Sequence, residues 1–206
     1  MRTLSKPAGV PVFPPHADPD GDCVLKRLLA EEPVRAALAW PEGFEGGIAH
    51  RLDTSTSGAL AVADDPEELE RLRALFRGRE LVKTYVLESA RDVPWDDNRC
   101  DRPIGHDPRH KGRMIVQRSP STAVRGRWMP ASTALRRLSG RRWEATMSTG
   151  VMHQIRVHAA FLGIPILGDR RYGGGPAVDG GFRLHHRGFV GPGIRTEPVP
   201  DPEWLR

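Results

Sequence analysis

Short apolar runs and alternation of polar with apolar side chains dominate the pattern of this chain, and both are typical of β-strands. Residues 59–63 form a small apolar run, which we expect to be a buried strand. Residues 81–88 alternate with a period of two, which places Lys83 and Tyr85 on the same face. Further strands are predicted at residues 114–117, 132–138 and 143–148.

A helical pattern is found in three places. The clearest helix is predicted to begin at residues 64–68, where acidic side chains and Pro66 suit a helix N-terminus. Gly78 is expected to end this helix. Its buried face is predicted to consist of Leu69, Leu72, Leu75 and Phe76. Shorter helices are predicted at residues 24–30 and at residues 151–162, the second closed by Gly163.

The remaining segments have no clear period. Residues 4–13 are expected to be extended and interrupted by prolines, and residues 31–47 to be a loop with a helical turn around residues 34–39. We expect residues 92–112 to be irregular and residues 164–181 to be a glycine-rich loop. Several strands with few helices favour the α+β class over repeated βαβ units.

The composition is that of an ordinary globular domain. The chain has 206 residues, of which 38% are hydrophobic and 28% charged. No apolar run is long enough to span a bilayer, and the first residues lack the apolar core of a signal peptide. Cys23 and Cys100 lie far apart and form no redox or metal motif, so we expect a reducing, cytoplasmic setting.

The charge balance is basic. Lys and Arg together number 31 against 26 Asp and Glu, and the net charge of +5 is carried by arginine far more than by lysine. Arginine suits bidentate phosphate contacts and stacking on bases, so a nucleic-acid partner is one explanation. A genome of high GC content, which enriches arginine regardless of function, is the other explanation.

The most informative polar segment is residues 50–58, His-Arg-Leu-Asp-Thr-Ser-Thr-Ser-Gly. It has no apolar period and is rich in turn-forming residues, so it is predicted to be a loop that holds Asp53 in a fixed position beside Arg51. A carboxylate that nearby cations keep ionised suits a nucleophile or a base. The alternative is an aspartate that only caps a turn.

Residues 150–158 contain a second polar group, formed by His153, Gln154, Arg156 and His158. The histidines are five residues apart, which is poor spacing for a metal on one helical face, and no glutamate stands where a zinc protease needs it. We therefore expect no metal, and an arginine supported by His and Gln against an anion. The alternative is a partly buried helix whose polar groups are satisfied locally.

A third candidate is the glycine-rich segment 165–175, which carries basic side chains and Tyr172. It suits close approach to a phosphate backbone and stacking on a base, and a simple surface loop is the alternative. The sequence has no Walker A segment, no dinucleotide-binding fingerprint and no Gly-x-Ser-x-Gly segment. Neither ATP dependence nor a serine hydrolase is therefore supported.

Taken in order, these segments resemble the RluA family of pseudouridine synthases over roughly residues 4–200. The resemblance is carried by Lys6-Pro7-Ala8-Gly9-Val10, by Gly47-Ile48-Ala49-His50-Arg51-Leu52-Asp53 with Thr56-Ser57-Gly58, by Lys83-Thr84-Tyr85, by His153-Gln154-Ile155-Arg156-Val157-His158, by Gly163-Ile164-Pro165-Ile166-Leu167-Gly168-Asp169 with Tyr172-Gly173, and by Arg183-Leu184-His185.

The resemblance implies a single α+β catalytic domain over residues 1–206, with a mixed, mostly antiparallel central sheet, a cleft along it, and a Pro/Gly-rich tail at about 190–206. It implies that a uridine in tRNA or rRNA is detached from its ribose at N1, turned, and rejoined through C5. No cofactor and no metal are needed, and the enzyme is expected to be a monomer of the shorter branch, without an S4-type domain.

The resemblance also implies residue roles. Asp53 is the essential carboxylate, and it either attacks C1′ or removes the 2′ proton. Arg156 pairs with Asp53, and Tyr85 stacks on the base and helps to remove the C5 proton. The expected substrate-binding residues are Arg51, which fills the stack after the uridine is flipped out, Ile155, which packs on the other side of the base, and Lys6, Lys83, His153, Gln154 and Tyr172.

The chain departs from the family pattern at Val151-Met152, where Arg-Thr or a similar polar pair is usual, and at Thr54-Ser55. The strand ahead of Lys6 is also cut to about five residues. Val151-Met152 and the short N-terminal strand motivate a second hypothesis, a non-catalytic RNA-binding protein on the same scaffold. A metal-dependent hydrolase that uses the histidines is the third.

Overall fold

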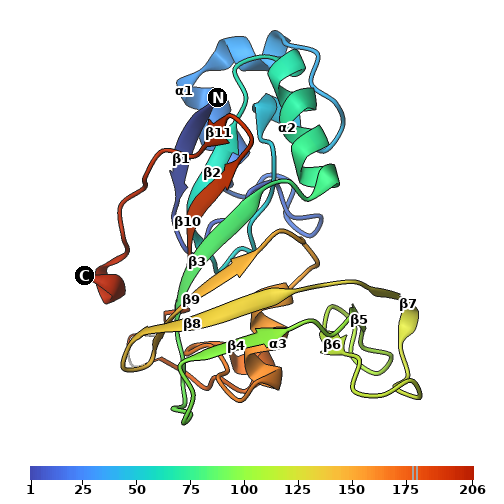
Figure 1. Ribbon diagram of the computed structural model, residues 1–206. Helices are drawn as coiled ribbons and strands as arrows, with labels where there is room; N and C mark the ends of the chain where they lie inside the picture. The colour runs from blue at the N-terminus through green and yellow to red at the C-terminus, as the bar shows by residue number, and fades with distance from the viewer. Residues whose placement is uncertain (178, 180) are drawn as a thin grey trace. The chain divides into compact units, whose positions relative to one another are not determined.

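The computed structural model describes residues 1–177, 179 and 181–206, and the chain divides into two compact units. The terminal unit contains Met1–Lys83 and His185–Arg206, and the central unit contains Thr84–Leu184. In Figure 1 the terminal unit comprises the blue to green start of the chain and its red end. Compact units need not be separate domains, so the single domain expected over residues 1–206 stays a prediction.

The terminal unit is built on β2 (Ser57–Val62), in which every residue is buried. This confirms the strand predicted at residues 59–63, which begins two residues earlier than expected. Strand β1 (Arg2–Lys6) pairs with β2 antiparallel, with Lys6 opposite Gly58. Strand β10 (Leu184–Gly191) pairs with β2 parallel, and β11 (Ile194–Arg195) pairs with β10 antiparallel.

Helix α2 (Pro66–Gly78) begins as the sequence predicts, because the Asp65 side chain accepts a hydrogen bond from the backbone N–H of Glu68 at 2.8 Å. Leu69 and Leu72 are buried against Ala61 and Ala63 in one apolar core. The helix ends at Gly78, as predicted. Arg79 takes the left-handed conformation that closes the helix, with φ of 58°.

Shorter elements complete the terminal unit. Helix α1 (Val24–Glu31) confirms the helix predicted at residues 24–30, and the Cys23 sulfur caps it by accepting from the Lys26 N–H. The helical turn predicted around residues 34–39 is the 3₁₀ helix η1 (Pro33–Ala37). Two further 3₁₀ turns are η2 (Glu45–Gly47) and η4 (Glu203–Leu205).

The central unit contains two groups of antiparallel strands. In the first, β8 (Thr133–Ser139) pairs with β9 (Arg142–Met147) and with β4 (Asp97–Cys100). In the second, β5 (Ile104–His106) pairs with β6 (Met114–Val116) and β7 (Arg125–Met129). The strands predicted at 114–117, 132–138 and 143–148 are confirmed. Strand β3 (Val82–Glu88), also predicted, begins in the terminal unit and continues into the central unit.

The prediction of irregular structure at residues 92–112 is wrong, because β4 and β5 both lie there, and β7 was not predicted at all. These strands are three to five residues long and mostly polar. They therefore lack the apolar alternation by which a strand is found in a sequence. The partner of β4 lies far along the chain, and β5 pairs with both its neighbour β6 and the more distant β7, so pairing in the folded protein defines these strands.

Helix α3 (Gln154–Phe161) is shorter than the predicted 151–162. It begins at Gln154 because His153 has a left-handed backbone, with φ of 57°. The expected loop at residues 164–181 contains the 3₁₀ turn η3 (Arg170–Tyr172), and residues 178 and 180 lie outside the described residues. In the terminal unit β2 and β10 pair in parallel, and the other strand pairs described above are antiparallel, so the mixed α+β class is confirmed. None of the described helices is long and apolar enough to cross a membrane.

The tight pairing of β2 with β10 gives a stability prediction. Gly58 has φ of 124°, and a Cβ atom there would lie 2.1 Å from the carbonyl oxygen of His186. We expect Gly58→Ala to lower the free energy of unfolding by at least about 3 kcal/mol in urea denaturation.

The matched control is Gly9→Ala, since Gly9 also has a positive φ, 86°, but no atom within 4 Å of the added Cβ. Strain alone should then lower the free energy of unfolding by about 1–2 kcal/mol. Equal losses in the two variants would show that the β2–β10 contact is not what requires glycine.

Candidate active site

The Asp53 loop in the terminal unit is held by a buried lysine. Lys6, the last residue of β1, is 1% exposed. Its ammonium group donates hydrogen bonds to the carbonyl oxygens of Pro7, Thr54 and Thr56 at 2.9, 3.0 and 2.7 Å. The N–H of Thr56 also donates to the carbonyl of Asp53 at 3.0 Å. Two of the three ammonium donors therefore fix the backbone on the C-terminal side of Asp53, and the third is satisfied by Pro7.

The electrostatics of this loop couple Lys6 to Asp53. Burial lowers the pKa of the Lys6 ammonium to about 8, and the negative charge of Asp53 opposes that shift. The predicted loop with a cation near its carboxylate is therefore present in the terminal unit. Lys6 thus holds the backbone that follows Asp53, and its predicted contact with substrate stays a prediction.

The two other site residues predicted in the terminal unit differ in exposure. Arg51 is exposed, two residues before the half-buried Asp53. Lys83 is buried on β3, and its ammonium nitrogen lies 5.8 Å from the centre of the Phe76 ring. Burial lowers the pKa of Lys83 to about 8.

A group of histidines behind the loop was not predicted. The Nε2 atom of His50 accepts the N–H of Ala61 at 3.1 Å, and its ring packs against Phe76, Phe189 and His186. Burial, followed by the charges of His186 and Lys83, holds the pKa of His50 well below its usual value. His50 is thus a neutral acceptor that fixes the start of the Asp53 loop to β2.

In the central unit, Arg156 is held by a carboxylate and two aromatic rings. Its Nε and Nη2 atoms donate to the two carboxylate oxygens of Asp169 at 2.8 and 2.9 Å, and Asp169 is 1% exposed. The guanidinium carbon lies 5.2 Å from the ring centres of both Tyr172 and Phe182. A bidentate ion pair between aromatic rings fixes both the plane and the direction of the cation.

Asp169, the partner of Arg156, is not among the site residues that the sequence analysis predicted. It is the only acidic residue in the basic, glycine-rich segment 165–175. This lone acid among basic residues was the sequence feature that could have indicated an ion pair. The pairing of Arg156 with Asp53 was predicted and stays a prediction.

The polar residues at the start of α3 support the helix. Gln154, 2% exposed, accepts from Thr149 and from the N–H of Val151, and it donates to the carbonyl of Ser132. His158 is bonded to Thr133 and to the carbonyl of Arg102. The sequence analysis gave, as an alternative, a partly buried helix whose polar groups are satisfied locally. The bonds of Gln154 and His158 fit that alternative. The substrate-binding role predicted for Gln154 stays a prediction.

Tyr172 joins α3 to the rest of the central unit. Its hydroxyl oxygen accepts the N–H of Met114 at 2.9 Å and lies 2.9 Å from Nδ1 of His153. The ring is 7% exposed, so stacking on a base is a prediction that its present burial does not favour. Tyr85 on β3 and Ile155 in the first turn of α3 are also buried, at 7% and 3% exposed.

The structure therefore presents the predicted residues as two preorganised groups. In the terminal unit, Lys6 supports the loop of Asp53. In the central unit, the Tyr172 hydroxyl lies 2.9 Å from Nδ1 of His153, and the Tyr172 ring centre lies 5.2 Å from the guanidinium carbon of Arg156. Among the described residues, no three His, Cys, Asp or Glu side chains are grouped so that they could hold a metal ion.

Comparison with known proteins extends this result. The family model described as RNA pseudouridylate synthase matches residues 2–161. A Chloroflexus aurantiacus protein named as an uncharacterized RNA pseudouridine synthase is 38% identical over 174 residues, which cover 82% of this chain and 51% of that protein. The ribosomal large subunit pseudouridine synthase D of Xanthomonas campestris is 35% identical over 179 residues, 84% of this chain and 49% of that protein. The chain thus spans about half the length of these curated relatives.

Solved structures agree on the fold. The human RNA pseudouridylate synthase domain containing 1 protein superimposes with a TM-score of 0.73 at 24% identity, covering 97% of this chain and 79% of that one. At this identity the likeness concerns the fold alone. The family model, which spans most of the chain and includes both the Asp53 loop and α3, is decisive: this chain belongs to the RNA pseudouridylate synthase family.

Proposed function

We propose that this protein isomerises uridine to pseudouridine within RNA. The observation that carries the proposal is the loop of Asp53 in a member of this family, which the buried Lys6 ammonium holds by hydrogen bonds to the carbonyl oxygens of Thr54 and Thr56. A carboxylate on a fixed backbone needs little reorganisation before it reacts.

The reaction is an internal rearrangement. The N1–C1′ bond of uridine breaks, the base turns, a C5–C1′ bond forms, the C5 proton leaves to a base, and N1 gains a proton. Atoms and electrons balance without a co-substrate. Asp53 acts either by bonding to C1′ or by taking the 2′ proton, and both routes require the ionised carboxylate.

We assign Arg156 the role of the cation that faces this carboxylate in the reacting complex. Burial of an aspartate raises its pKa, and a positive charge that is already fixed offsets that effect. The bidentate pair with Asp169 supports the assignment, because it leaves the guanidinium little freedom. Tyr85 and Ile155 are assigned to opposite faces of the target base, and Arg51 to the stack that the flipped uridine leaves.

The RNA substrate is proposed to be rRNA or tRNA. One relative at 35% identity is named for the large ribosomal subunit, which favours rRNA as the first substrate to test. No step of the reaction requires a metal or a cofactor, so the proposed enzyme works with its own side chains.

The first test is the Asp53→Asn variant, which keeps the shape of the side chain and removes its charge. We expect release of tritium from RNA labelled at uracil C5 to fall by about three orders of magnitude or more. RNA binding and the melting temperature should stay close to those of the wild type. Wild-type release by this variant would refute the assignment of Asp53, and wild-type protein that binds RNA without any release would favour the non-catalytic alternative.

A second test concerns Lys6. In Lys6→Met the three carbonyl oxygens lose their donor, so the loop should loosen and kcat should fall about 10- to 100-fold, with little change in the Kd for RNA. The control is Lys26→Met, since Lys26 is 40% exposed and its nearest carboxylate lies 4.0 Å away. A loss confined to Kd would instead make Lys6 a direct RNA ligand.

A third test concerns Asp169. We expect Asp169→Asn to lower kcat by about 100-fold while the KM for RNA changes little, because Arg156 loses the charge that orients it. The matched control is Asp92→Asn, which removes an exposed carboxylate that pairs with Arg137 at 2.8 Å in the same unit. Unchanged kcat in Asp169→Asn, with the protein folded, would exclude a positioning role for Asp169.

A further inference from the structure

We propose that the sheet β6-β5-β7 and its loops, residues 101–129, form a basic arm that binds the RNA phosphate backbone beside the Arg156 site. The inference rests on the proposed function, since it assumes that the substrate is RNA. It concerns a surface of the central unit to which the sequence analysis assigned no residue.

The charge of the basic arm is concentrated. Residues 101–129 contain seven Lys or Arg and two Asp, a formal charge of +5 that equals the net charge of the whole chain. The other residues together are therefore neutral. A positive charge confined to one segment points to a polyanionic partner, whereas arginine enrichment from genome composition alone would spread over the chain.

Both acids of the arm already bind neighbouring groups. Asp101 is paired with Arg99 at 2.9 Å. Asp107 is 7% exposed, accepts the N–H of Arg109 at 2.8 Å, and lies 3.1 Å from Nδ1 of His110. Its carboxylate shapes the loop between β5 and β6 and contributes little negative charge to the surface.

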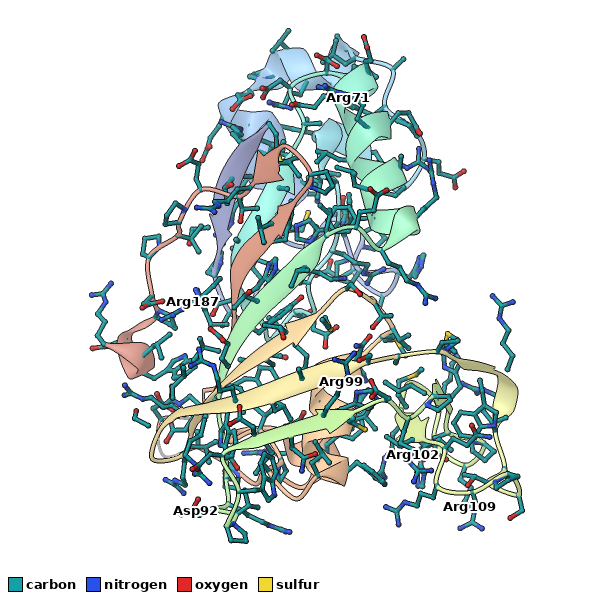
Figure 2. All side chains as sticks on the ribbon, viewed as in Figure 1. Arg71, Asp92, Arg99, Arg102, Arg109 and Arg187 are labelled. Atoms are coloured by element: carbon teal, nitrogen blue, oxygen red, sulfur yellow. The ribbon has the colours of Figure 1, made fainter. Side chains whose placement is uncertain are left out.

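The basic side chains face outward. Six of them are exposed, and in the described part of the chain none of the six forms an ion pair with a carboxylate: Arg102, Arg109, Lys111, Arg118, Arg125 and Arg127. Figure 2 shows the labelled Arg102 and Arg109 extending from the arm. Unpaired surface cations are available to replace the counterions of a nucleic acid.

The arm is anchored to the residues that hold Arg156. Its apolar residues Ile104, Met114 and Val116 share one core with Val157 of α3 and with Tyr172. The N–H of Met114 donates to the Tyr172 hydroxyl, and Arg171 donates to the carbonyl of Gly112 at 2.5 Å. An RNA backbone bound by the arm would therefore be held in a fixed register with Arg156.

The chemistry of the arm favours phosphates over bases. Its one large aromatic residue, Trp128, packs over Gly105, where an added Cβ would lie 2.9 Å from the indole ring. The outward face thus offers guanidinium and ammonium groups with no exposed aromatic platform. Contacts of this kind are strongly dependent on salt and largely independent of sequence.

The experiment compares two triple variants of the full chain. The arm variant is Arg109→Gln, Lys111→Gln and Arg127→Gln. The control is Arg71→Gln, Arg77→Gln and Arg187→Gln, which removes the same charge from exposed arginines of the terminal unit, two of them labelled in Figure 2. The probe is a 23S rRNA transcript, and Kd is measured from 50 to 300 mM salt.

We expect the arm variant to raise Kd at least tenfold at 150 mM salt and to reduce the slope of log K against log salt by about 2 to 3, since each lost phosphate contact removes about 0.7 to 0.9. The control should change Kd by less than twofold. Melting temperatures should stay near that of the wild type, because neutral surface substitutions have small effects on stability.

The outcomes separate this inference from the proposed function. Equal values of Kd and of the salt slope in the two triple variants would refute RNA binding by the arm, even if the wild type releases tritium from the RNA. A loss confined to the arm variant would support the arm, even if no tritium is released and the proposed isomerisation fails. Competition by polyglutamate as effective as that by RNA at equal charge would also overturn it, since the arm would then bind anions in general.

Discussion

The Asp53 loop depends on one buried ammonium group. Burial of an unpaired cation is unfavourable, and the lowered pKa of Lys6, about 8, records that cost. Three carbonyl oxygens and the nearby charge of Asp53 offset it. Pro7 follows β1, and Thr54 and Thr56 precede β2. The Lys6 ammonium therefore joins the end of one strand to the loop that leads into its partner.

In the central unit the buried charge is negative, and a cation satisfies it. Asp169 is a buried carboxylate, and the Arg156 guanidinium satisfies both of its oxygens. The rings of Tyr172 and Phe182 lie near the guanidinium, and Tyr172 is in turn fixed through its hydroxyl. A charge supported in this way is already oriented before substrate arrives, which is the condition for electrostatic stabilisation of a transition state.

Buried polar side chains of helix α3 set the position of Arg156. Gln154 and His158 bind atoms of β8 and of the segments that flank it, and an apolar core with Ile104 and Met114 lies beside the helix. The helix begins at a left-handed His153, so the first turn, which carries Ile155 and Arg156, has a defined direction. The same packing connects the basic arm to this turn.

Features that depend on neighbouring residues could be predicted from the sequence. They are the cap of α2 at Asp65, the alternation of β3 and the loop of Asp53. The motifs that indicate the family, and their order along the chain, could also be found there. The sequence did not determine β4, β5 or β7, the left-handed Arg79, or the Asp169 partner of Arg156. Caps and periods result from interactions within a few residues, so they are visible along the chain. Strand pairing, burial and the partner of a buried charge depend on residues far apart, and only the tertiary structure brings those together.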